Sequence, residues 1–168
     1  MDWVVISAVA EMTAAFGVVG SLIFVGFQVR QNSAGLRYAA AQSLITTYND
    51  LFSNVIDSEE FAGIFRQGLQ DLGSLDGASS TRFYAFSSKA LRIYQGMHWQ
   101  WQRGAIDDGL FMSMTTLLED FSTSPGWRDL WRNRRHQYDA DYQSFMDKLI
   151  EEGNGKPMYS DLDLKDAG

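Results

Sequence analysis

Residues 12–29 read MTAAFGVVGSLIFVGFQV, eighteen residues without a charged side chain. A helix of this length is about 27 Å long, close to the ~30 Å hydrocarbon thickness of a bilayer. The uncharged residues 3–10 extend the apolar stretch on its N-terminal side, and Arg30 ends it. Residues 1–32 therefore predict one membrane-spanning helix near the N-terminus.

Three other structures compete with a membrane span for this segment. A cleaved signal peptide has a basic start, whereas this chain begins Met1-Asp2-Trp3 and carries Glu11 inside the apolar stretch. An interfacial helix needs a strongly charged face, which the segment lacks. A buried core helix of a water-soluble protein stays open as an alternative, because the stretch is barely long enough to span and is rich in Gly and Ala.

The flanking charges predict the orientation of the span. Arg30 and Arg37 follow it, while the N-terminal side offers no Lys or Arg. Basic residues stay on the cytoplasmic side of a membrane, so we expect the C-terminal part of the chain in the cytoplasm.

Small residues recur along the predicted span at intervals of three and four. They predict a membrane-embedded oligomer interface, since small side chains let helix backbones approach closely in lipid. The alternative is that membrane helices are simply rich in small residues. The members of this stripe are Ser7, Ala10, Ala14, Gly17 and Ser21. Beside it lies Glu11, a candidate functional intramembrane acid or, alternatively, a carboxylate at the outer lipid interface.

From residue 33 to residue 152 the apolar positions repeat every 3.6 residues, and no sustained period of two occurs. This pattern predicts an all-α fold with a cytoplasmic bundle of about five or six helices. The first helix, over residues 34–56, is separate from the span or continues it. Polar, acidic residues then predict a flexible tail over 153–168.

Helix boundaries follow from capping residues. The pattern Asp57-x-x-Glu60 resembles a capping box, and Ser80 follows a Gly- and Ser-rich loop at the start of another helix. Further signals are a stop at Gly104, a cap at Asp107 or Asp108, the pair Ser124-Pro125, and a break near Asp139. The helix before Gly104 places Phe86 and Trp101 on its apolar face and Trp99 off it.

Composition excludes several functional classes. The net charge of −7 argues against nucleic-acid binding, and the absence of cysteine excludes disulfides and thiolate metal sites. The two histidines, His98 and His136, lack metal-ligand spacing to each other or to a carboxylate, so we expect no metal and no cofactor. No motif of a nucleophilic Ser, a phosphate-binding loop or a dinucleotide site occurs. The sequence therefore does not favour the hypothesis of an enzyme.

One basic cluster follows Pro125. We consider it a candidate contact for a phosphate or an anionic lipid headgroup, against the alternative of a solvated helix face paired with neighbouring acids. Its arginines are Arg128, Arg132, Arg134 and Arg135.

Several segments together resemble a family of uncharacterised bacterial proteins with an apolar N-terminal helix that ends in Gln-[Ile/Val]-Arg-Gln-Asn. The segments are residues 22–32, 65–69 and 102–104, and Ser124-Pro125-Gly126-Trp127 leading into Trp131-x-x-Arg134-Arg135. The resemblance covers roughly residues 5–150. It implies a bacterial inner-membrane location and the helical fold, and it transfers no activity and no site.

These observations favour a membrane-anchored interaction or assembly protein. We expect it to work in the lipid bilayer as a homo-oligomer or as an accessory subunit of a membrane protein partner. A second hypothesis is a channel or transport element in which Glu11 and Gln28 line a polar path. A third is a ligand sensor or enzyme that uses a pocket between the aromatic helices.

Overall fold

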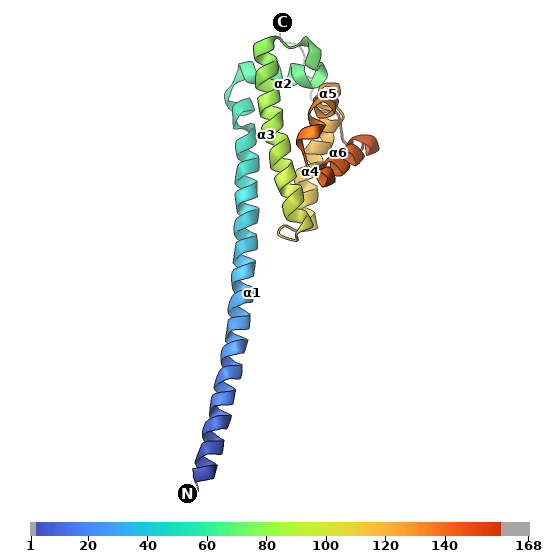
Figure 1. Cartoon of the computed structure of the whole chain (residues 1–168). Coiled ribbons are helices and arrows are strands. Elements are labelled where there is room, and N and C mark those ends of the chain that lie inside the picture. The colour runs from blue at the N-terminus through green and yellow to red at the C-terminus, as the bar shows by residue number, and fades with distance from the viewer. Residues whose placement is uncertain (1–2, 159–168) are drawn as a thin grey trace. The chain divides into compact units, whose positions relative to one another are not determined.

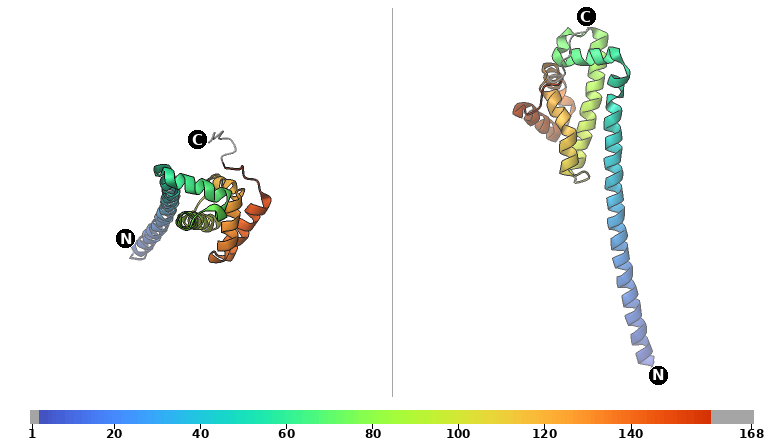
Figure 2. Two further views of the ribbon diagram at one scale, coloured as in Figure 1. Left: turned by 90° about the horizontal axis from the view of Figure 1, so that it is seen from above. Right: turned by 180° about the vertical axis from the view of Figure 1, so that it is seen from behind.

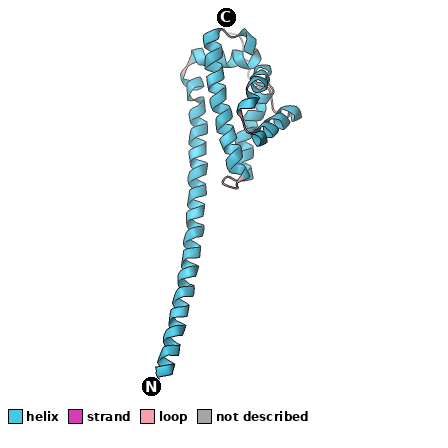
Figure 3. Ribbon diagram, viewed as in Figure 1, coloured by secondary structure: helices cyan, strands magenta, loops and turns pink. Residues whose placement is uncertain are grey.

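The computed structural model describes residues 3–158, and this part of the chain is all-α, as predicted (Figure 3). Two short 3-10 turns, η1 (Leu72–Ser74) and η2 (Arg135–Gln137), join helices. The six α-helices are α1 (Trp3–Asp57), α2 (Glu59–Gln70), α3 (Gly77–Gln102), α4 (Asp108–Ser122), α5 (Pro125–Arg134) and α6 (Ala140–Glu152).

Helix α1 continues without a break through the position where we expected a domain boundary. Asn32 and Gly35 both lie within it, and the Ser33 hydroxyl donates to the Val29 carbonyl oxygen at 2.8 Å. The alternative in which residues 34–56 continue the first helix is therefore the one observed. The chain divides into two compact units, Met1–Gln42 and Ser43–Gly168.

The first unit contains an exposed apolar helical stretch, residues 3–29. Every large apolar side chain from Trp3 to Val29 is at least 46% exposed, and the most apolar eighteen-residue window has no buried residue. By length and composition this helix could cross a membrane or act as a signal sequence. The core-helix alternative requires burial of these residues, which the structure does not show.

The second unit is a helical bundle around α3. Helix α3 lies between residues 43–57 of α1 and the group formed by α4, α5 and α6 (Figures 1 and 2). On the α1 side, the Tyr48 ring packs against Tyr94 with centroids 6.2 Å apart, and Phe52 packs against Phe86 at 6.4 Å. Apolar burial on both sides of α3 holds the bundle together.

Two of the predicted helix starts are wrong. Helix α2 is capped by Ser58, whose hydroxyl accepts from the Phe61 amide at 3.1 Å; Asp57 is the last residue of α1 and is not free to take the extended cap conformation. Helix α3 is capped four residues before Ser80, by Asp76, whose carboxylate accepts from the Ser79 amide at 2.7 Å.

The other boundary signals are confirmed. Asp107 caps α4 and Asp139 caps α6, each through its carboxylate. Pro125 occupies the first turn of α5, although the Ser124 side chain makes no capping hydrogen bond. Gly104 follows the end of α3 with a φ of 65°, a left-handed conformation that favours glycine.

The bundle core is built mainly from aromatic rings. Phe65 is 1% exposed, and its ring centroid lies 5.0 Å from that of Phe86 and 5.7 Å from that of Phe121. On α4 Phe111 is buried, while Leu110 and Leu117 are only partly buried.

Helices α2 and α5 touch through their backbones at two glycines. A Cβ atom at Gly126 of α5 would overlap the carbonyl oxygen of Gly68 of α2 and lie 3.1 Å from that of Leu69. A Cβ at Gly68 would in turn overlap the ring of Phe83. Both positions therefore require glycine for close approach.

We predict that Gly126→Ala lowers the free energy of unfolding by about 3 kcal/mol or more, because its methyl group meets rigid backbone rather than a mobile side chain. Gly96→Ala in α3 is the matched control. No atom lies within 4 Å of a Cβ there, so the variant should gain up to ~1 kcal/mol from helix propensity. Chemical denaturation followed by circular dichroism measures both, and equal stabilities would contradict the close contact.

Candidate functional site

The predicted membrane stripe lies entirely on α1, where all its members are exposed. With 100° per residue, Ser7, Ala10, Ala14, Gly17 and Ser21 fall within about 80° of arc. No atom lies within 4 Å of a Cβ at Gly17. The Ser7 hydroxyl donates to the Glu11 carboxylate at 3.5 Å, so the predicted acid lies beside the stripe.

The four predicted arginines do not converge on one site. Arg128 donates to the Ser122 carbonyl oxygen at 2.7 Å, and Arg132 pairs with Asp129 at 2.8 Å. The Arg134 guanidinium stacks on the Tyr84 ring at 4.7 Å, and Arg135 forms a forked pair with Asp147. Each guanidinium already has a partner within the bundle.

The forked pair ties the start of η2 to α6. Arg135 lies 2.6 Å from one carboxylate oxygen of Asp147, and the Trp131 indole donates to the other at 2.9 Å. These hydrogen bonds hold the pKa of the Asp147 carboxyl below its ordinary value. The geometry indicates a structural role for Arg135.

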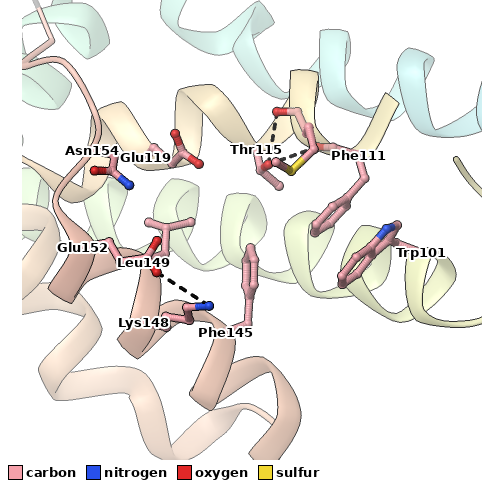
Figure 4. A pocket seen from close by; sticks show the side chains of 10 residues that line it. Trp101, Phe111, Thr115, Glu119, Phe145, Lys148, Leu149, Glu152 and Asn154 are labelled. Atoms are coloured by element: carbon pink, nitrogen blue, oxygen red, sulfur yellow. Dashed lines mark hydrogen bonds and ion pairs between the residues drawn. The ribbon is translucent and has the colours of Figure 1, made fainter. Parts of the chain in front are cut away.

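A cavity lies between α4 and α6, beside the end of α3, and we call it the α4–α6 pocket (Figure 4). It has a volume of about 260 Å³. Aromatic side chains gather at one end and charged side chains at the other. The lining residues are Trp101, Phe111, Met112, Thr115, Glu119, Phe145, Lys148, Leu149, Glu152 and Asn154.

The aromatic end is held in place by stacking and one hydrogen bond. The Trp101 and Phe111 rings stack with centroids 4.5 Å apart and planes 5° apart. The Trp101 indole donates to the Asp108 carboxylate at 2.8 Å, which fixes the ring in its plane. Trp101 is thus a half-buried wall of the pocket and not the core residue that we predicted.

His98 lies behind this aromatic wall. It is 5% exposed, and its ring centroid lies 4.7 Å from that of Phe145 and 5.8 Å from that of Trp101. Burial lowers the pKa of His98, against the opposing effect of Asp139 and Asp141, so the ring is neutral at pH 7.

The charged end carries two carboxylates and one ammonium group. Lys148 and Glu152 lie 3.6 Å apart, an i,i+4 pair exposed to solvent. Glu119 faces them from α4 (Figure 4), and burial together with Asp120 and Glu152 raises the pKa of its carboxyl. Within residues 3–158 no basic side chain pairs with Glu119.

The segment after α6 folds back onto α4 beside this end. Gly153 ends α6 with a φ of 59°, and the Lys156 amide donates to the Asp120 carboxylate at 2.7 Å. A Cβ at Gly155 would overlap the Glu119 backbone. The first residues of the predicted flexible tail are therefore packed, while residues 159–168 lie outside the described part.

A second hollow, of about 420 Å³, lies between α2 and α3. Its one carboxylate, Glu60, is paired with Arg82 at 2.7 Å, and Lys89 also lines it. No group of three His, Asp or Glu residues suited to a metal occurs within residues 3–158.

Comparison with known proteins finds no matching family model, no matching curated protein and no matching solved structure.

The α4–α6 pocket was missed by sequence reasoning. The sequence pattern places Trp101 on an apolar helix face and marks neither Phe145 nor Glu119 as a site residue. The available signal was the spacing of Phe111, Thr115 and Glu119, which lie four residues apart on one face of α4.

We predict that Trp101→Ala lowers the free energy of unfolding by about 2 kcal/mol, less than the ~3–5 kcal/mol typical of a fully buried aromatic residue. Phe86→Ala, in the core, should cost that full amount, since Phe86 is 5% exposed. Trp99→Ala should cost under ~1 kcal/mol, because the ring is 53% exposed and only the Arg103 guanidinium stacks on it, at 3.9 Å. Urea denaturation ranks the three variants, and a loss at Trp99 equal to that at Phe86 would refute this assignment of faces.

Proposed function

We propose that this chain is a single-pass protein of a bacterial inner membrane that holds its helical bundle in the cytoplasm as an interaction or assembly protein. The observation that supports this most directly is the exposed apolar helix of residues 3–29 in a chain whose helical bundle has a core of its own.

Exposure of such a helix to water is costly. Burying apolar surface contributes roughly 25 cal/mol per Å², and contiguous exposed patches larger than a few hundred Å² mark membrane or protein contacts. None of residues 3–29 is buried, and the buried residues of α1 begin only at Leu44. Lipid is the environment that suits a predominantly apolar, exposed helix of this length.

The flanking charges support a cytoplasmic bundle, and the small residues of α1 support assembly through that helix. Arg30 and Arg37 follow the apolar stretch and favour a cytoplasmic bundle. In lipid, helices associate through close packing, which the small residues around Gly17 would permit. A homo-oligomer joined through α1 is therefore the assembly that we propose.

The anchor is tested by fractionation. We predict that the full chain stays in the membrane pellet after carbonate extraction, and that deletion of residues 1–30 releases a soluble, helical protein with its core intact. The intact mass of the membrane-bound protein should include residues 1–30. A soluble full chain would contradict the anchor, and loss of the N-terminal residues would indicate a cleaved signal sequence.

Self-association is tested by a pair of glycine variants. Gly17→Leu should lower the oligomeric mass in detergent, because a bulky side chain would separate helices packed through the stripe. Gly26→Leu is the matched control, since it lies nine residues further on and hence about 180° around the helix. Neither position has an atom within 4 Å of a Cβ, so neither variant disturbs the single chain. Equal masses for both variants would show that assembly does not use the stripe.

A further inference from the structure

We propose that the α4–α6 pocket binds a small organic cation, a protonated amine attached to a single aromatic ring or a short alkyl body. All residues that line the pocket belong to the bundle, so ligand binding does not require the membrane anchor.

The apolar end of the pocket suits a flat ring. Phe111 and Trp101 form one rigid stacked surface, and Phe145 lies with its ring centroid 5.7 Å from that of Phe111. Their fixed rings offer apolar contact at little cost in side-chain entropy, and offset stacking adds to it. Leu149 continues this apolar surface toward the charged end (Figure 4).

The opposite end suits a positive charge. Glu119 and Glu152 contribute two negative charges and Lys148 one positive charge, so this end has a net charge of −1. The Lys148 ammonium pairs with the Glu152 carboxylate at 3.6 Å in a solvent-exposed position. No basic side chain of the described residues reaches Glu119. Asp120, the next acid on α4, is occupied by the Lys156 amide. The Glu119 carboxylate is therefore the group available to an incoming ammonium.

Two other polar side chains of the pocket already have hydrogen-bond partners and do not compete with Glu119 for the ammonium group. The Thr115 hydroxyl already donates within α4, to the Phe111 carbonyl oxygen at 3.0 Å. The Trp101 indole is held by Asp108. An anionic ligand would meet repulsion at Glu119, and a neutral one would leave that carboxylate without a partner.

The size of the pocket limits the ligand. At about 260 Å³ it is smaller than the ~300–1,000 Å³ of sites for drug-sized molecules. One ring with a short chain is small enough for this volume, and we place its ring at the aromatic end and its ammonium at Glu119. In this pose the ammonium donates a charge-assisted hydrogen bond to the Glu119 carboxylate.

The test uses the full-length protein in detergent and 2-phenylethylamine as the probe, with binding measured by isothermal titration calorimetry. We expect saturable binding, roughly tenfold weaker for Glu119→Gln, which loses the charge-assisted contact. Lys148→Met should bind several-fold more tightly, because a competing cation is removed. Asp129→Asn, on α5 outside the pocket, is the matched control and should bind like the unchanged protein.

Two further measurements distinguish binding in the pocket from partition of the probe into detergent. The neutral analogue 2-phenylethanol should bind at least tenfold more weakly than the amine. Affinity for the amine should fall as the pH drops through the pKa of Glu119, which lies above its ordinary value, because protonation removes the negative partner. Equal binding of amine and alcohol, no saturable binding, or unchanged affinity in both Glu119→Gln and Lys148→Met would overturn the proposal.

Discussion

The bundle depends on the backbone contact between Gly68 of α2 and Gly126 of α5. Helix α5 connects α4 to α6, so the place where it meets α2 limits where both of its neighbours can lie. The residue after the contact, Trp127, is fully buried and stacks on Phe121 of α4 with ring centroids 5.0 Å apart. A larger residue at Gly126 would move this whole group away from α2, and the aromatic core would lose its packing density.

The α4–α6 pocket is a consequence of this arrangement. Its walls come from three helices that meet because α5 turns the chain sharply after α4. The Arg135–Asp147 pair and the Trp131 indole then hold α6 in place. The segment around Gly155 packs against the Glu119 backbone at the pocket edge, and within residues 3–158 no basic side chain pairs with Glu119. The rigid aromatic end and the acidic end of the pocket are thus consequences of the packing that stabilises the bundle.

Helix α1 serves two environments with one continuous backbone. Around Tyr48 and Phe52 it contributes an apolar face to the bundle, in the manner of any amphipathic helix. Over residues 3–29 it is predominantly apolar and exposed, with Glu11 as the single charged side chain, which suits lipid rather than water. The polar residues between these parts, such as Ser33, satisfy their hydroxyls on the helix itself and so do not interrupt it.

The sequence by itself determined the properties that act within one or two helical turns. The 3.6-residue period, the apolar stretch before Arg30 and the caps at Asp107 and Asp139 follow from contacts among near neighbours, and all were predictable. The tertiary structure decided what depends on residues far apart in the chain. It placed Phe111 rather than Leu110 in the core, moved the cap from Asp57 to Ser58 because α1 runs on, and brought Glu119 opposite Lys148. Side-chain packing between helices sets these outcomes, and local periodicity carries no information about which partner each face will meet.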